Sequence, residues 1–250
     1  MKIFLAILLF LFSSLSFAQQ KLTFVTERWV PFNYLEKKQI VGISTELVKA
    51  SLEHAGFNYD MQLLPWQRAY RLTLKNPNHF LFTTNRTRAR ENLFKWVGPL
   101  YNQDVSFYRL KNKKHIKVNK LGELRNYTIG VSRGGSIEGY LKEIGYIENQ
   151  DYFTYFNEKQ GEKMLLSGHI DLIPGSQFNL AHKRMLAEDS SLQLVKAFTL
   201  TDTGYYIAAN INTDDEIINR LQDSLEHLIK NGLRQNVLER HFKKFDSAAE

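Results

Sequence analysis

The 250-residue chain contains no cysteine, and this absence excludes several kinds of chemistry. Without a thiol the protein has no disulfide, no iron–sulfur cluster, no cysteine-ligated zinc and no thiolate nucleophile. Two common catalytic motifs are also missing from the sequence, namely the H-E-x-x-H zinc pair and the phosphate-binding P-loop. The sequence therefore predicts a protein that is not an enzyme and that carries no metal or other cofactor.

The charge balance is moderately basic, with 33 Lys and Arg against 26 Asp and Glu and a formal net charge of +7 at pH 7. Hydrophobic residues make up 43% of the chain and charged residues 24%, which is typical of globular proteins and excludes a disordered chain. The length allows one large domain or two of about 100 to 150 residues each. The basic excess favours acidic ligands only weakly, because net charge acts mainly at long range.

The N-terminus has the features of a secretory signal peptide. Lys2 precedes an unbroken apolar stretch from Ile3 to Phe12, and the small residues Ser16 and Ala18 follow it. The stretch is too short for a membrane span of about 20 residues, and no other segment approaches that length. We expect residues 1–18 to be removed and the rest to be exported to the periplasm. A buried N-terminal helix is the alternative.

Short strand-like and helix-like segments alternate after this leader. Strands are expected at Leu22–Thr26, Tyr59–Leu64 and His79–Thr83. Helices are expected from Ser44, which can act as an N-cap, to Gly56, from Pro65 to Asn76 and from Arg88 to Phe94. Such alternation with short connections predicts an α/β protein whose mixed sheets are flanked by helices.

A basic polar run, Arg109 to Lys120, interrupts the alternation. It carries no interleaved aromatic residues that could stack on bases, so we interpret it as a solvated connection between domains and expect no nucleic-acid partner. A patch for nucleic acid or membrane is the alternative. The alternation begins again after the run, with a strand at Tyr127–Val131, a Gly-rich turn and a helix from Ser136.

Two helices are expected at the end of the chain, the first beginning with a capping box of Thr213 and Glu216 and the second running from Leu233 to about Phe242. The first domain lacks enough helices to cover its sheet, so we expect the chain to cross back to it. The predicted arrangement has two lobes, with residues 19–107 and 204–250 in the first and residues 108–203 in the second. Two crossings would form a hinge beside a ligand-binding cleft.

Eight short motifs stand in order along the chain. They are WVPF at Trp29–Phe32, VGISTEL at Val41–Leu47, TRAR at Thr87–Arg90, WVGPLY at Trp96–Tyr101, LGEL…YTIGVSRGGS at Leu121–Ser136, SGHIDLI at Ser167–Ile173, GYYIAAN at Gly204–Asn210 and LIKNGL at Leu228–Leu233. Their order and spacing resemble the bacterial extracellular solute-binding proteins of family 3. The resemblance implies the two-lobed type II periplasmic binding protein fold and a small carboxylate-bearing ligand, either amino-acid-like or an organic acid. It also implies a monomer whose partner is an inner-membrane ABC permease or a sensor receptor.

Arg90 is the residue on which the resemblance places the ligand. It occupies the family's T-x-x-R element with Thr87, and a guanidinium can hold a carboxylate through two hydrogen bonds. Thr87 and Asn85 would add polar groups on the same rim. Thr83 and Arg86 form a second T-x-x-R and leave the register open. An Arg in a surface salt bridge is the alternative role for Arg90.

The facing lobe offers Gly135 and Ser136, which follow a strand and open a helix, where backbone N–H groups attract anions. An ordinary glycine turn capped by Ser136 is the alternative. Trp29, Phe32 and Trp66 are candidates for an aromatic wall of the site, although each also suits a hydrophobic core.

Two further positions bear on the charge of the ligand. Arg68 could supply a second cation for a dianionic ligand, or it could be an ordinary helix-surface residue. Amino-acid-binding members of the family carry an acid five positions after the Asp that Asp171 matches, and this chain has Ser176 there. Ser176 offers a hydroxyl but no charge, so an α-ammonium group would need another carboxylate or an aromatic cage.

An enzyme on the same scaffold, such as a dehydratase, is the alternative function, because fold does not fix function. Such an enzyme needs an acid or base in the cleft. Glu27 and Glu138 are the acidic residues that the sequence places near it. A partner-sensing domain is a third alternative.

Overall fold

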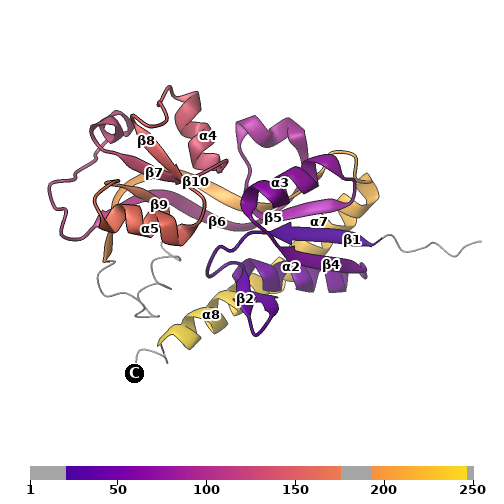
Figure 1. Cartoon of the computed structure of the whole chain (residues 1–250). Helices are drawn as coiled ribbons and strands as arrows, with labels where there is room; N and C mark the ends of the chain where they lie inside the picture. Colours follow the sequence, from indigo (N-terminus) through magenta and orange to yellow (C-terminus); the bar gives the residue numbers. More distant parts are fainter. Residues whose placement is uncertain (1–20, 176–192, 247–250) are drawn as a thin grey trace, which may run out of the picture.

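The computed structural model describes residues 21–175 and 193–246 and has two lobes side by side (Figure 1). The expected signal peptide, residues 1–18, and Ser176 lie outside the described residues. Helices and strands are mixed throughout, which confirms the α/β class. Within the described part of the chain, no helix is both long and apolar enough to cross a bilayer.

A six-stranded mixed sheet runs through the molecule in the order β4-β1-β5-β10-β6-β9. Its strands are β1 (Leu22–Thr26), β4 (Tyr59–Leu63), β5 (His79–Asn85), β6 (Phe94–Leu110), β9 (Ile173–Gly175) and β10 (Leu194–Asn210). β1 is parallel to β4 and β5, whereas β10 is antiparallel to β5 and β6. The parallel part requires helical crossovers, and these supply part of the helical cover of the first lobe.

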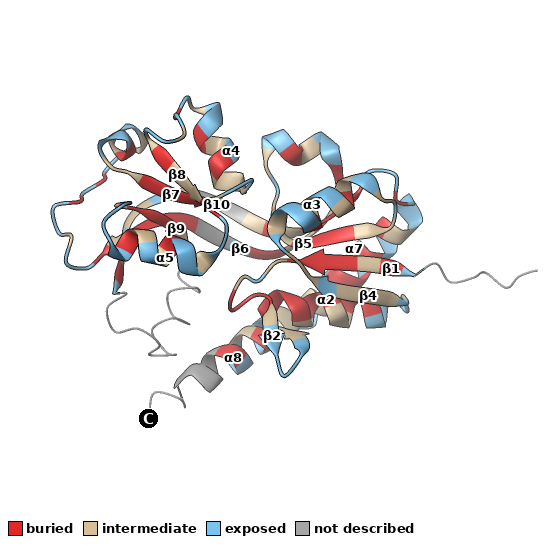
Figure 2. Cartoon of the chain, viewed as in Figure 1, coloured by how far each residue is buried: buried red, intermediate tan, exposed pale blue. Residues whose placement is uncertain are grey.

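Helices pack on both faces of the first-lobe sheet. They are α2 (Ile43–His54), α3 (Trp66–Lys75), α7 (Asp215–Lys230) and α8 (Leu233–Asp246). Successive strand residues point to opposite faces, so Phe24 and Phe80 join the core with α2, α7 and α8, while Val25 and Leu81 pack with Ala69 of α3. Figure 2 shows the result as buried strands under helices whose outer faces are exposed.

The chain crosses between the lobes inside two long strands. β6 and β10 are paired from Phe94 with Asn210 at one end to Leu110 with Leu194 at the other. The first core ends at Tyr101 and resumes at Tyr205, and the second core lies between them in sequence. The hinge is therefore a two-stranded antiparallel ribbon (Figure 1).

The basic run does not connect the two lobes. Arg109 lies near the end of β6, beyond the crossing, and the run continues inside the second lobe. Ile116 and Val118, which alternate with the exposed His115, Lys117 and Asn119, are buried in the second core. These two apolar side chains anchor the run, and this explains why its high charge does not mark a domain boundary.

The second lobe contains β7 (Ile129–Ser132) parallel to β8 (Tyr152–Tyr155), with α4 (Ser136–Glu143) and α5 (Glu158–Leu166) following these strands. This lobe also contains the 3-10 helix η2 (Leu121–Asn126). The first lobe also contains the hairpin of β2 (Tyr34–Glu36) and β3 (Gln39–Val41), and the 3-10 helix η1 (Arg88–Leu93). The helix expected at Arg88–Phe94 is thus a 3-10 helix.

The N-cap of α2 is not Ser44, the residue that the sequence predicts. Gly42 is the N-cap, and the N–H groups of Ile43 and Ser44 donate to the carbonyl oxygens of Pro31 and Phe32 at 3.0 Å each. Backbone carbonyls therefore satisfy donors that a side-chain cap usually satisfies. Gly42 has φ 122°, and a Cβ there would collide with the Phe32 carbonyl, so this close approach requires glycine.

The cap of α7 also differs by one residue from the expected capping box. The carboxylate of Asp214 accepts the N–H of Glu216 at 2.9 Å. Thr213 instead accepts the backbone N–H of Asn78 with its hydroxyl, at 3.1 Å. Thr213 therefore ties α7 to the turn before β5, a long-range contact that sequence spacing does not reveal.

Candidate functional site

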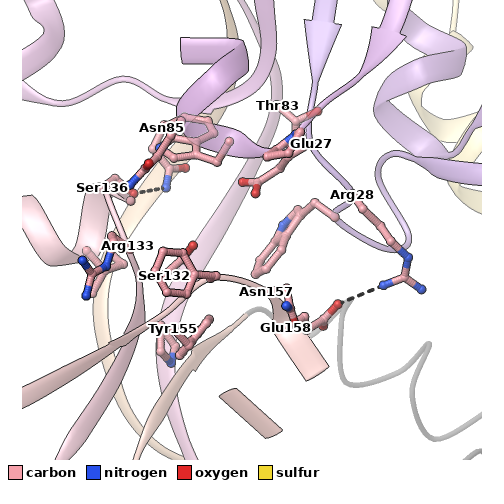
Figure 3. Close-up of a pocket in the computed structure, with 18 of the residues that line it drawn as sticks. Glu27, Arg28, Thr83, Asn85, Ser132, Arg133, Ser136, Tyr155, Asn157 and Glu158 are labelled. Carbon is pink, nitrogen blue, oxygen red and sulfur yellow. Dashed lines mark hydrogen bonds and ion pairs between the residues drawn. The ribbon is translucent and has the colours of Figure 1, made fainter. Parts of the chain in front are cut away.

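A cavity of about 690 Å³ lies between the lobes and is lined from both of them. Figure 3 shows Glu27, Thr83 and Asn85 of the first lobe opposite Ser132, Tyr155 and Asn157 of the second. The first-lobe lining also includes Arg28, Trp29, Leu63–Gln67, Arg90 and Tyr205, and the second-lobe lining includes Arg133, Gly135–Ile137, Phe156, Glu158, Lys159, Pro174 and Gly175. Its size is that of pockets that enclose small organic molecules.

Arg90 lies at this cavity and is only 7% exposed. Its guanidinium stacks over the rings of Trp66 and Tyr70, 5.0 and 5.2 Å from their centroids. Its N–H groups donate to the carbonyl oxygens of Asn85 and Gly134 across long distances of 3.4 and 3.5 Å. Burial lowers the pKa of Arg90, and Tyr70 and Glu27 act in the opposite direction.

The second T-x-x-R has a different position. Arg86 forms an ion pair with Glu91 and stacks on Trp96 and Tyr206, and it does not line the cavity. Of the two T-x-x-R arginines, Arg90 therefore lines the cavity and Arg86 does not.

Besides the long hydrogen bond from Arg90 to Gly134, three contacts join the lobes across the cavity. Trp66 donates its indole N–H to the Gly134 carbonyl at 2.7 Å, and the Asn85 amide donates to the Ser136 hydroxyl at 2.8 Å. Arg28 forms an ion pair with Glu158 at 3.4 Å. In Figure 3 the Asn85 and Arg28 contacts lie on opposite sides of the cavity. The lobes are thus held together at both sides of the site.

The glycine loop of the second lobe presents the start of α4 to the cavity. Gly135 is the N-cap and Ser136 the first helical residue, so Ser136 does not cap the helix. The carboxylate of Glu138 accepts the N–H of Gly134 and pairs with Lys142, and it does not line the cavity. Glu138 is therefore a structural residue of this loop. The first-turn N–H groups of Ser136 and Ile137 have no acceptors within the helix and remain as donors for an anion.

Glu27, directly after β1, is the acidic residue that the first lobe directs into the cavity (Figure 3). Its pKa is raised from 4.5 to about 7, mainly because of burial and then because of the nearby Glu158, while Arg90 acts in the opposite direction. The buried amide of Asn33 donates to the Glu27 carbonyl at 2.7 Å and accepts the hydroxyl of Thr83. The backbone of Glu27 is therefore fixed by a buried hydrogen-bond chain.

The aromatic candidates occupy different places. Trp29 and Trp66 both line the cavity, and Trp29 donates its indole N–H to the Tyr205 hydroxyl at 2.7 Å. Phe32 is fully buried and packs edge-on against Tyr101 and Tyr205 in the first core. Phe32 therefore supports the wall of the cavity from behind without lining it.

Two other candidates lie outside the lining of the cavity. Thr87 precedes η1, and its carbonyl accepts the N–H of Arg90 at 2.9 Å. It shapes the turn that carries Arg90. Arg68 is exposed on α3 and is separate from the cavity lining. Since helix positions 66 and 68 point in different directions, Trp66 and Arg68 cannot both face the cleft.

Several lining residues were not expected from the sequence, namely Arg28, Arg133, Tyr155, Phe156, Asn157 and Glu158. Most of them follow the parallel strands β7 and β8 directly, at the carboxyl ends. Ligands of α/β sheets bind at this edge, so the loop after β8 could have been proposed on the same ground as the glycine loop after β7.

Replacing Arg28 by alanine is expected to speed ligand dissociation about twofold to fivefold. The Arg28–Glu158 pair joins the lobes, but the Arg28 side chain is 56% exposed, so the pair contributes little in water. Stopped-flow dissociation in low and high salt measures the effect, which should disappear in high salt because screening already removes the pair. An unchanged rate in low salt would contradict a role in closure.

The hinge of paired strands and the cavity lined from both lobes form the two-lobed architecture of a periplasmic binding fold. The model of the bacterial extracellular solute-binding proteins, family 3, matches residues 22–244, and the chain belongs to this family. No relative was found among curated proteins. The described residues contain no group of three or more His, Asp or Glu placed to hold a metal ion.

Solved structures share the fold. A histidine kinase sensor domain with similarity to periplasmic binding proteins has a TM-score of 0.78 and 17% identity, covering 89% of this chain and 96% of that one. The arginine-, lysine-, histidine-binding protein ArtJ from Geobacillus stearothermophilus has a TM-score of 0.75 and 17% identity, covering 92% and 100%. An ancestral amino-acid-binding protein, a precursor of cyclohexadienyl dehydratase, has a TM-score of 0.72 and 18% identity, covering 88% and 94%. These matches confirm the type II periplasmic binding fold.

Proposed function

We propose that the protein captures a small solute that carries a carboxylate, and that the carboxylate binds between Arg90 and the first turn of α4. The observation that supports this most is the state of Arg90. Its guanidinium is 7% exposed, and in the described part of the chain no carboxylate forms an ion pair with it. A buried cation is costly unless it is paired, and a ligand carboxylate would supply the missing anion.

The solute carries a cationic group as well, so it is amino-acid-like rather than a simple organic acid. Glu27 and Glu158 both line the cavity, and after burial the nearby Glu158 makes ionisation of Glu27 less favourable. A ligand ammonium or guanidinium near Glu27 would relieve this repulsion. Trp29 on the same wall offers a ring face to a cation. Glu27 would thus supply the negative charge that amino-acid-binding relatives have at the position of Ser176.

The captured solute is delivered to a membrane partner from the periplasm, by a monomer that closes about the hinge. Closure joins residues of both lobes into one surface that a permease or a receptor can recognise. Relatives of the fold include both an amino-acid-binding protein and a sensor domain, which supports either an ABC permease or a sensor receptor as partner.

A thermal-shift screen tests the proposal directly. Amino acids and organic acids are added singly at concentrations up to about 100 times a micromolar dissociation constant, where a specific ligand stabilises the fold by about 2.7 kcal/mol. We expect the melting temperature to rise by about 5 to 10 °C with at least one amino-acid-like compound. Stabilisation by no compound in the screen would contradict a solute-binding role.

A dehydratase-like enzyme is the second candidate, and Glu27 is the observation that favours it. A carboxyl group with a pKa of about 7 in a cleft is suited to general acid–base catalysis. Incubation of the stabilising ligands with the protein, followed by mass spectrometry, decides between the two functions. A product formed by the wild type but not by Glu27→Gln would establish an enzymatic function. Recovery of unchanged ligand from the wild type would establish a binding function.

A further inference from the structure

We infer that the cleft contains a second subsite, the outer subsite, in which Phe156 and Arg133 of the second lobe face Leu63, Leu64 and Trp66 of the first. It would receive an apolar group, preferably an aromatic ring, that extends from the charged part of the solute. The inference rests on the proposed function and names the class of ligand more closely: an elongated zwitterion such as an aromatic amino acid or a short peptide.

Phe156 is the side chain on which this inference depends most. It is 70% exposed, which is more than any other exposed large hydrophobic side chain in the described residues, yet it lines the cavity. Arg133 covers it on one side, with the guanidinium 4.9 Å from the ring centroid. A large apolar surface left open inside a pocket is a feature of ligand-binding sites.

The usual structural role of an apolar residue at this position does not account for Phe156. It precedes Asn157, the N-cap of α5, where an apolar side chain commonly packs on the fifth residue after it. That residue is Gly161, which has no side chain and lies against Tyr155. Phe156 also belongs to none of the hydrophobic clusters of the described residues.

The backbone under Phe156 is nevertheless held firmly. Gln160 accepts the Phe156 N–H with its side-chain oxygen at 2.9 Å, and its own N–H donates to the Asn157 side chain at 3.0 Å. Arg133 is fixed in turn by hydrogen bonds to Thr154 at 2.8 and 3.2 Å. The ring is therefore presented by a preorganised cap, and preorganisation reduces the entropic cost of binding.

The opposite wall is apolar and belongs to the first lobe. Leu63, Leu64 and Trp66 line the same cavity and are only partly buried. Closure of the lobes would place an inserted ring between this wall and Phe156. Arg133, which also pairs with Glu148 at 3.7 Å, lies over the Phe156 ring, and its guanidinium favours the electron-rich face of an aromatic ring over a cation.

The test uses two pairs of compounds that differ by one benzyl group: glycine with L-phenylalanine, and diglycine with glycyl-L-phenylalanine. Isothermal titration compares them on the wild-type protein and on Phe156→Ala. We expect each benzyl compound to bind about tenfold more tightly than its partner to the wild type, and the difference to fall to about twofold in Phe156→Ala. Ile147→Ala, which removes a 55% exposed side chain outside the cavity, is the matched control and should leave the tenfold preference intact.

The outcomes separate the two proposals. If compounds bind but the benzyl preference is absent, or is the same in Phe156→Ala, the outer subsite is wrong and the proposed function stands. Loss of the preference in Ile147→Ala as well would also overturn it, because the effect would not be local to the cleft. If no compound in either this set or the amino-acid screen binds, the proposed function fails and the outer subsite fails with it.

Discussion

Replacement of Arg90 by alanine is expected to weaken binding of carboxylate-bearing ligands by about 100-fold or more, equivalent to about 3 kcal/mol. The reason is that Arg90 is buried at the cleft, where a charge-assisted pair is poorly screened and its loss leaves the ligand carboxylate without a counter-charge. Titration calorimetry with the ligand found by the screen measures the change. Arg90→Lys should lose about tenfold, because a lysine keeps the charge but not the planar fork.

Arg68→Ala is the matched control, since Arg68 is an exposed arginine of the same lobe outside the cavity lining. It should leave affinity within about twofold of the wild type. Thermal melting without ligand establishes that each variant is folded. Equal affinities of Arg90→Ala and wild type, with both proteins folded, would remove the basis of the proposed function.

Glu27 is expected to make the binding of cationic ligands depend on pH. Its pKa of about 7 means that most of the free protein holds a proton on Glu27 at pH 5.5, and that proton must leave before a cation can pair with the carboxylate. Affinity should therefore fall about 30-fold between pH 8 and pH 5.5. Titration calorimetry across this range measures the fall, and Glu27→Gln should bind weakly with little dependence on pH. A Glu27→Gln profile as steep as that of the wild type would contradict the assignment.

The same substitution is expected to stabilise the ligand-free protein at alkaline pH. Glu27 has a higher pKa in the folded state than in the unfolded state, so between pH 4.5 and about 7 the folded state holds the proton more strongly and stability falls as the pH rises. Above pH 7 the full cost of ionising the carboxyl is present. Glu27→Gln avoids this cost, about 3 kcal/mol, and should melt about 6 to 12 °C higher at pH 8.

At pH 4.5 the two proteins should melt at nearly the same temperature, because Glu27 is then protonated in the folded state. Glu36→Gln, which changes an exposed acid of β2, is the control and should leave the melting temperature unchanged at both pH values. A lower melting temperature of Glu27→Gln at pH 8 would show that the Glu27 carboxylate stabilises the protein, contrary to its raised pKa.

Local sequence patterns were sufficient to predict most helices and strands and to predict the family. The strand Leu22–Thr26 and the helix after Pro65 lie where periodicity and proline chemistry predict them. The eight motifs predict the same family that the match over residues 22–244 establishes. These features depend on residues close together in sequence, and their signals survive without tertiary information.

Charge patterning was misleading at the basic run, because the alternating Ile116 and Val118 that hold it in the second core are outnumbered by lysines. The caps of α2 and α7 were displaced because distant backbone groups, at Phe32 and Asn78, bond with the expected capping residues. In each case a long-range contact decides the local structure, and long-range contacts are invisible to spacing rules.

The sequence by itself determined the α/β class, the family and the presence of an arginine that matches the family's ligand element. Only the tertiary structure decided which arginine reaches the cleft, since Arg86 pairs with Glu91 while Arg90 is buried beside Trp66. It also brought Glu27 of the first lobe into one cavity with Phe156 and Glu158 of the second lobe, which are far from Glu27 in the chain. The physical reason is that ionisation and ligand contact depend on neighbours in space, which the folding of two lobes over one hinge creates.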